Sequence, residues 1–95
     1  MTSTMGSNRQ LRALRGATTA EANTAEAIGA AVADLVQALV ERNQLMGDQV
    51  VSVTFSVTTD LDACFPAAIA RRQLGWEQVA LLDCQQMAVA GDLPR

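Results

Sequence analysis

The 95-residue sequence contains no histidine, no lysine and no tyrosine, so arginine supplies all seven of its basic side chains. Cysteine is scarce as well: Cys64 and Cys84 stand apart without a CxxC spacing, and the absence of histidine also argues against a metal site. Isolated cysteines in a chain without a signal peptide are typical of buried, reduced thiols in a cytosolic protein. A disulfide between them remains open at this stage.

Charge and aromatic content exclude further classes of protein. Ten acidic residues against seven arginines give a net charge of −3, whereas nucleic-acid-binding proteins need a basic face. The aromatic residues are Phe55, Phe65 and Trp76, too few for a base-stacking surface. No apolar run approaches the roughly 20 residues that span a bilayer. We therefore expect a cytoplasmic protein that binds neither nucleic acid nor membrane.

The length of the chain is sufficient for one small domain. Small domains often recruit a second subunit, and the hydrophobic share of 49% leaves apolar surface that oligomerisation would bury. The polar start, residues 1–8, is predicted to be a disordered leader, and residues 9–95 a single domain.

Apolar periodicity predicts one long amphipathic helix over residues 24–43, with hydrophobic side chains at steps of three and four. Either Asn23 or Thr24 could cap it. With Asn23 the spacing to Glu26 is that of a capping box, and with Thr24 the glutamate still favours the positive helix end. Gly29 lowers the helix propensity and therefore indicates close packing at that position.

Strand patterns flank this helix. Residues 10–18 lead into a turn, and the β-branched run 49–58 predicts a strand with one core face and one small hydroxylic face. Phe65 and Pro66 open a short helix through Gln73, which Gly75 ends. Two short strands are expected to follow, over residues 78–82 and 85–89. The order predicts an α+β fold with one long and one short helix on one face of a mixed sheet.

Arg15 stands at the end of the first predicted strand, directly before Gly16. An arginine fixed at such a junction can hold a carboxylate or phosphate through two parallel N–H bonds. The alternative is that Arg15 marks the end of the strand and points into water.

A series of short fragments extends in one order from about residue 9 to the end of the chain. Together they resemble the trimeric, Bacillus-type (AroH-class) chorismate mutase family. The fragments are Arg15-Gly16-Ala17-Thr18-Thr19, Asn23-Thr24, Glu26-Ala27-Ile28, Asp48-Gln49-Val50-Val51-Ser52, Thr59-Asp60-Leu61-Asp62-Ala63, Phe65-Pro66-Ala67, Ala70-Arg71, Gly75-Trp76 and Leu93-Pro94-Arg95.

This resemblance implies an isomerase of aromatic amino-acid biosynthesis that converts chorismate to prephenate without a cofactor. The reaction is a pericyclic rearrangement, so the protein holds a flexible dianion in a compact, chair-like conformer and stabilises charge on the breaking ether bond. The resemblance also implies a ferredoxin-like subunit in a pseudo-barrel homotrimer, with substrate sites between neighbouring subunits.

The resemblance assigns roles to individual residues. Arg15 matches the arginine that binds a substrate carboxylate, and Arg71 matches a second arginine near the mouth of the site. Phe65 matches an aromatic residue that lines the pocket, with ordinary core packing as its alternative. Leu82 is also expected among the substrate-binding residues.

The segment from Leu82 to Gln86 departs from the family pattern. Gln86 falls where many members place a glutamate, and Asp83 falls three residues earlier. We hypothesise that Asp83 replaces the missing carboxylate in catalysis and substrate binding, while Gln86 keeps a neutral hydrogen bond. Odd spacing on a strand sends the two side chains to opposite faces, so they would serve one site from two chains. The alternative is that Asp83 is a turn residue.

A second departure concerns the C-terminal side of the domain. In the family, a strand carrying a further arginine follows the Leu-Pro-Arg fragment, and a tyrosine and a covering segment come later. The sequence ends at Arg95, which predicts a domain lacking that strand and tail. Loss of one positioned hydrogen-bond donor, such as this further arginine, typically lowers the rate by ~10²- to 10³-fold. The alternative functions are therefore a non-catalytic, dicarboxylate-binding pseudoenzyme and a structural trimer module.

Overall fold

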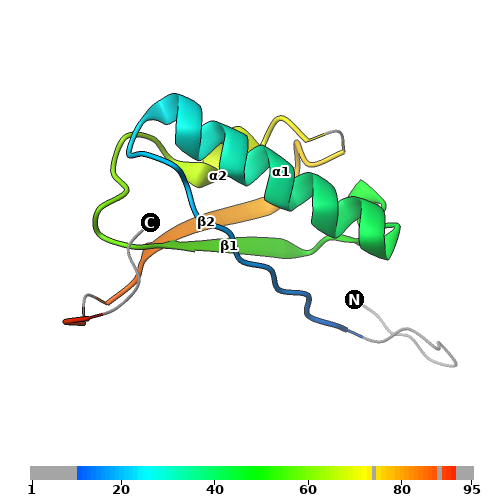
Figure 1. Ribbon diagram of the computed structural model, residues 1–95. Helices are drawn as coiled ribbons and strands as arrows, with labels where there is room; N and C mark the ends of the chain where they lie inside the picture. Colours follow the sequence, from blue (N-terminus) through cyan, green and yellow to red (C-terminus); the bar gives the residue numbers. More distant parts are fainter. Residues whose placement is uncertain (1–10, 74, 88, 92–95) are drawn as a thin grey trace, which may run out of the picture.

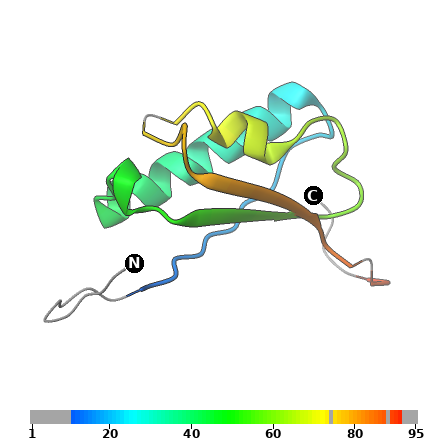
Figure 2. The same ribbon diagram turned by 180° about the vertical axis from the view of Figure 1, so that it is seen from behind.

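Two helices lie on one face of a small parallel sheet in the computed structural model, which describes residues 11–73, 75–87 and 89–91 (Figures 1 and 2). The predicted leader and the Leu-Pro-Arg fragment lie outside these residues. The elements in chain order are α1 (Ala25–Asn43), the 3₁₀ helix η1 (Gly47–Gln49), β1 (Ser52–Val57), α2 (Pro66–Ala70) and β2 (Ala80–Gln85).

Helix α1 confirms the long amphipathic helix that the periodicity predicts. Thr24, rather than Asn23, is its N-cap: the backbone of Thr24 is extended and its hydroxyl accepts from Ala27 N at 3.0 Å. The helix ends at Asn43, and the C-cap Gln44 is in the left-handed conformation with φ of 52°. Its buried face consists of Ile28, Val32 and Val36.

Helix α2 packs against α1 and is shorter than predicted. A Cβ atom on Gly29 would lie 3.5 Å from Ile69 Cδ1, an ordinary van der Waals distance, so α2 contacts α1 here without an approach that only glycine allows. After Ala70 the backbone bonds shorten to three-residue steps, from Arg72 N to Ile69 O and from Gln73 N to Ala70 O. Because of this tighter winding, the residues after Ala70, predicted as the last part of the helix, form a turn instead.

The sheet consists of β1 and β2, paired in parallel from Ser52↔Ala80 to Val57↔Gln85. The strand predicted over residues 49–58 is shorter in the structure. Within β1 its predicted faces are confirmed, because valine and phenylalanine side chains are half-buried while Ser52 and its alternate neighbours are exposed. The two short strands predicted around Asp83 and Cys84 are instead one strand, β2. Asp83 is therefore a strand residue, and the turn alternative for it is wrong.

Residues 11–20 are extended but do not belong to the two-stranded sheet of the described residues. Gly16 lies against α1, where an added Cβ would meet Leu35 Cδ1 at 2.8 Å and Leu39 Cδ2 at 3.5 Å. The predicted strand is missing because this segment lies along α1, whereas a strand requires a ladder of hydrogen bonds with a neighbour. The α+β class is confirmed; the sheet of the described residues is parallel rather than mixed.

The buried core joins one face of α1 to the end of α2 and the loop before β2. Both cysteines are free, and Cys84 is exposed on the outer face of β2, so the expectation that both thiols are buried is wrong for Cys84. Among the described residues no helix has the length and hydrophobicity needed to cross a membrane. The core residues are Ala20, Ile28, Val32, Val36, Ala70, Trp76 and Val79.

Candidate active site

A groove of about 1240 Å³ opens between the segment 11–20, helix α1 and strand β1. Helix α1 contributes apolar side chains to its wall, and the hydroxylic residues of β1 contribute polar atoms. Two of the sequence-predicted site residues, Arg15 and Gln86, line this groove, whereas the other four do not. The described structure thus brings one predicted cation and one predicted neutral hydrogen-bonding group to a common surface.

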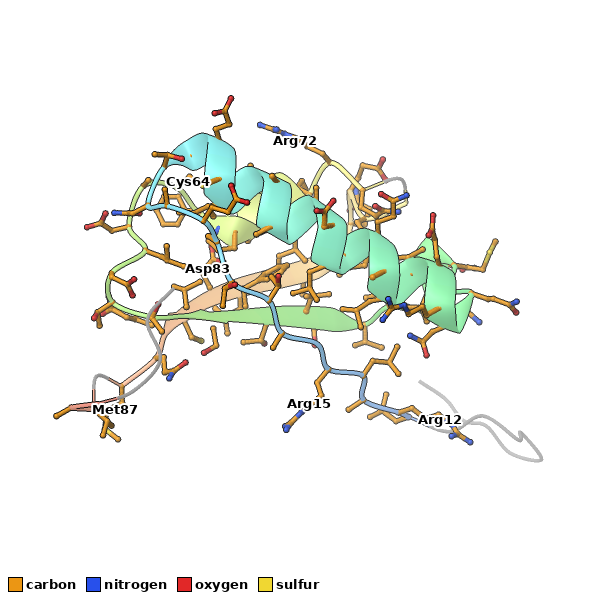
Figure 3. The ribbon with its side chains drawn as sticks, in the orientation of Figure 1. Arg12, Arg15, Cys64, Arg72, Asp83 and Met87 are labelled. Carbon is orange, nitrogen blue, oxygen red and sulfur yellow. The ribbon has the colours of Figure 1, made fainter. Side chains whose placement is uncertain are left out.

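Arg15 is positioned by the glycine that follows it. Gly16 has no side chain, so the segment approaches α1 closely at Leu35 and Leu39. The Arg15 side chain is exposed and points away from the helical layer (Figure 3). An exposed guanidinium at the rim of a groove can form a paired hydrogen bond with a carboxylate of a small molecule.

Gln86 directly follows β2 and is held by its backbone. Its N–H donates to Val57 O at 2.6 Å, which extends the parallel ladder by one bond beyond the strand. The side chain is exposed. A side-chain amide carries both a donor and an acceptor, so Gln86 can bind a hydroxyl group but supplies no negative charge.

Asp83 lies on the other face of the sheet, between β2 and the helices (Figure 3). Its half-buried carboxylate accepts at Oδ1 from Ala67 N, 3.0 Å away, in the first turn of α2. The carboxylate therefore ties the start of α2 to β2. Within one subunit Asp83 faces the helices while Arg15 points away from them, so this structure does not bring the two side chains together.

Phe65 and Leu82 are exposed apolar side chains outside the groove. Phe65 is the N-cap of α2 and is 72% exposed, so the core-packing alternative for it is wrong. Leu82 is 57% exposed and alternates along β2 with half-buried residues that face the helices. Its side chain therefore belongs to the outer face of the sheet.

Arg71 follows α2, and its guanidinium is engaged by the loop between α2 and β2. Nη1 donates to the carbonyl oxygens of Trp76 at 3.1 Å, Glu77 at 3.1 Å and Val79 at 2.6 Å. These bonds fix the path of the chain into β2. In this arrangement Arg71 serves the loop, and a carboxylate ligand would have to compete with the three carbonyl groups.

Asn23, which the sequence offers as a possible helix cap, instead binds a loop in the structure. Since Thr24 caps α1, the Asn23 side chain is available to other partners, and it binds the loop at Asp62 and Ala63. The sequence offers one signal for this role, an amide residue directly before a threonine cap, but nothing in it identifies the partner.

Comparison with known proteins identifies the family. The model of the family described as chorismate mutase type I matches residues 11–95. Chorismate mutase AroH of Thermus thermophilus is 41% identical over 86 residues, which are 90% of this chain and 70% of that protein. The AroH of Bacillus subtilis strain 168 is 38% identical over 85 residues, 90% of this chain and 67% of that protein.

A solved structure agrees with both sequence comparisons. The chorismate mutase from Clostridium thermocellum superposes with a TM-score of 0.75 at 40% sequence identity, covering 81% of this chain and 68% of that one. The match thus holds at the level of the sequence and at the level of the fold. The chain belongs to the type I chorismate mutase family.

Proposed function

We propose that this protein catalyses the rearrangement of chorismate to prephenate in aromatic amino-acid biosynthesis. The observation that carries the proposal is the family match over residues 11–95. Both curated relatives are named as chorismate mutases, so the pseudoenzyme and structural-module alternatives are not favoured. The reaction breaks one C–O bond and forms one C–C bond within a single molecule, and it requires neither a nucleophile nor a proton donor.

We propose Arg15 and Gln86 as the two site residues that line the groove. Arg15 would bind a carboxylate of the substrate dianion through its guanidinium, and Gln86 would bind the hydroxyl group through its amide. Both residues line the same groove, which supports assigning them to one site. Such contacts select the compact conformer, because the flexible substrate loses most of its rotational freedom when both ends are held.

Phe65, Leu82 and Arg71 are proposed as further substrate-binding residues. The exposure of Phe65 and Leu82 supports this, since large apolar side chains that are open to solvent can cover a bound molecule. Arg71 would need to exchange at least one of its carbonyl partners for a substrate carboxylate. A charged acceptor forms the stronger hydrogen bond, so the exchange is chemically reasonable.

Asp83 is proposed as the carboxylate that replaces the family glutamate, in a homotrimer with sites between subunits. Because Asp83 and Arg15 face different sides within one subunit, a site that uses both needs two chains. The outer face of the sheet supports self-association, since its exposed side chains are small or apolar and uncharged. These residues are Ser52, Thr54, Ser56, Ala80, Leu82 and Cys84.

Both cysteines are free, which suits the reducing cytoplasm, where we propose that the enzyme acts.

The test is prephenate formation by the purified protein, with Arg15→Ala as the site variant. Loss of a positioned charged donor should lower kcat/KM by about 10²-fold or more. Arg72→Ala is the matched control, because Arg72 is also exposed and points to the solvent side of the helices (Figure 3). Failure of the unsubstituted protein to form prephenate would refute the proposed activity, and equal effects of the two variants would refute the role of Arg15.

The trimer is tested separately by sedimentation equilibrium. Leu82→Arg places a charge on the outer face of the sheet and should shift the protein to monomers. Ala30→Arg, at an exposed position of α1, is the control that should leave the assembly unchanged. A monomeric unsubstituted protein, or an unchanged Leu82→Arg trimer, would contradict the proposed interface.

A further inference from the structure

We infer that Asn23 is a positioning residue for the substrate site, because its side-chain amide holds the loop that carries Phe65. The inference rests on the proposed function, in which Phe65 lines the substrate pocket. Asn23 and its loop partners lie outside the groove, and no proposed catalytic role includes them.

The Asn23 side chain binds two consecutive loop residues, Asp62 and Ala63. Asn23 Nδ2 donates to Asp62 Oδ1 at 2.7 Å, and Asn23 Oδ1 accepts from Asp62 N at 2.9 Å and from Ala63 N at 3.1 Å. An amide side chain can form about four hydrogen bonds, so most of its capacity is used here. We call these three bonds between Asn23, Asp62 and Ala63 the clasp.

A second contact reinforces the clasp. Cys64 Sγ lies 4.0 Å from Ala25 O, in the first turn of α1 (Figure 3). Three consecutive loop residues, 62–64, therefore contact the segment 23–25. The helix start is itself capped, because the Thr24 hydroxyl accepts a separate hydrogen bond from Ala27 N. The clasp thus joins a loop to a fixed point.

Phe65 is the residue directly after this tied segment. At 72% exposure its ring gains little positional restraint from packing, so its place depends on the backbone that carries it. On its other side, Ala67 in the first turn of α2 is bound to Asp83 of β2. Phe65 is therefore held between two anchors, Asn23 at the start of α1 and Asp83 on the sheet.

Loss of the clasp should affect substrate binding more than the chemical step. If Asn23→Ala releases residues 62–63, Phe65 must be ordered anew each time that substrate binds. Ordering one side chain on binding weakens affinity by about three- to tenfold. We therefore expect KM to rise by about that factor while kcat stays within about twofold, because the groups that stabilise the transition state lie on other elements.

A pair of reciprocal substitutions separates the clasp from general stability. Asn23→Asp removes the donor and places two carboxylates together, so it should raise KM more than Asn23→Ala. In the double variant Asn23→Asp/Asp62→Asn the groups are exchanged: the carboxylate at position 23 still accepts from both backbone N–H groups, and the amide at position 62 donates to it. The double variant should restore KM to within about twofold of the unsubstituted protein.

Gln37→Ala is the matched control. Gln37 Nε2 donates to Glu41 Oε2 at 2.9 Å, so this substitution also removes an exposed amide–carboxylate hydrogen bond on α1, but one that stays within the helix. It should leave KM unchanged.

Amide hydrogen exchange supplies a readout that does not depend on turnover. Asn23→Ala should accelerate exchange of the Asp62 and Ala63 amides, and the double variant should slow it again. Unchanged exchange or unchanged KM in Asn23→Ala would overturn the inference. Recovery of exchange without recovery of KM in the double variant would overturn it as well. An unsubstituted protein that forms no prephenate would instead refute the proposed function, and with it the substrate role of the clasp.

Discussion

The substitution Arg71→Ala distinguishes a role in the fold from a role in binding substrate. The family resemblance assigns Arg71 to a substrate carboxylate, whereas its Nη1 atom donates to the carbonyls of Trp76, Glu77 and Val79 at 3.1, 3.1 and 2.6 Å. An amino group has only two hydrogens, so at least one of them is shared between two carbonyls. We expect the substitution to release the loop that leads into β2.

The expected loss of stability follows from the number and type of these bonds. A hydrogen bond with a charged donor contributes about 1.5–3 kcal/mol when it is well protected. Arg71 is exposed and water can replace it at part of the cluster, so the sum is smaller than three full contributions. We expect Arg71→Ala to lower the free energy of unfolding by about 2–4 kcal/mol. Arg71→Lys should recover part of this loss, because an ammonium group can also donate to the carbonyls.

Denaturant unfolding followed by the fluorescence of Trp76 measures this effect directly. Trp76 is the single tryptophan of the chain, it is 4% exposed, and its own carbonyl accepts from Arg71. Arg72→Ala, at the exposed neighbouring position, should change the free energy of unfolding by no more than about 0.5 kcal/mol. Equal stability of the two alanine variants, combined with a higher KM for Arg71→Ala alone, would refute the loop role and favour the substrate role.

Substitutions at three further positions test the packing by the same unfolding measurement. Gly47→Ala should cost about 3 kcal/mol, because the new Cβ would overlap Gly75 O, a backbone atom that cannot move aside; a loss under about 1 kcal/mol would contradict this close approach. Gly16→Ala should cost no more than about 1 kcal/mol, since its neighbour is the end of a flexible leucine side chain. Asp83→Ala should lose about 1 kcal/mol with the bond to Ala67 N, whereas Asp83→Asn should keep an acceptor. Unchanged kcat/KM in Asp83→Asn would contradict its proposed catalytic role.

Local sequence patterns correctly predicted helix α1 and the two faces of β1, because the spacing of apolar residues within each element determines which face is buried. Helix α1 follows from apolar steps of three and four, and the two faces of β1 follow from strict alternation. The choice of Thr24 over Asn23 as the cap did not follow, because both residues can cap a helix. The choice depends on Asp62, 39 residues further along the chain, whose loop forms hydrogen bonds with the Asn23 side chain.

The errors in the sequence prediction have tertiary causes. Aspartate is depleted in strands, so Asp83 suggested a break between two strands, but its carboxylate is satisfied by α2 across the layer. The segment 11–20 alternates like a strand and yet lies along α1 at Gly16. The three carbonyl partners of Arg71 likewise depend on the path of the following loop. In each case the deciding partner belongs to another element.

The opposite placement of Arg15 and Asp83 yields a test of the proposed intersubunit site. In a trimer with sites between neighbours, an Arg15→Ala subunit lacks one half of a site and an Asp83→Asn subunit lacks the other. Random mixing of the two variants should give roughly a quarter of the sites an intact Arg15 from one chain and an intact Asp83 from the next. Activity should then recover toward about a quarter of the unsubstituted value.

The same mixture distinguishes the alternatives sharply. If both residues act from one chain, every site of the mixed trimer contains a defect, and its activity equals the mean of the two variants measured alone. If Asp83 serves only as the anchor of α2, Asp83→Asn is fully active by itself and mixing restores nothing. Recovery above the mean, with refolding of the mixed chains to allow exchange of subunits, is expected only when the groove of one subunit takes its carboxylate from its neighbour.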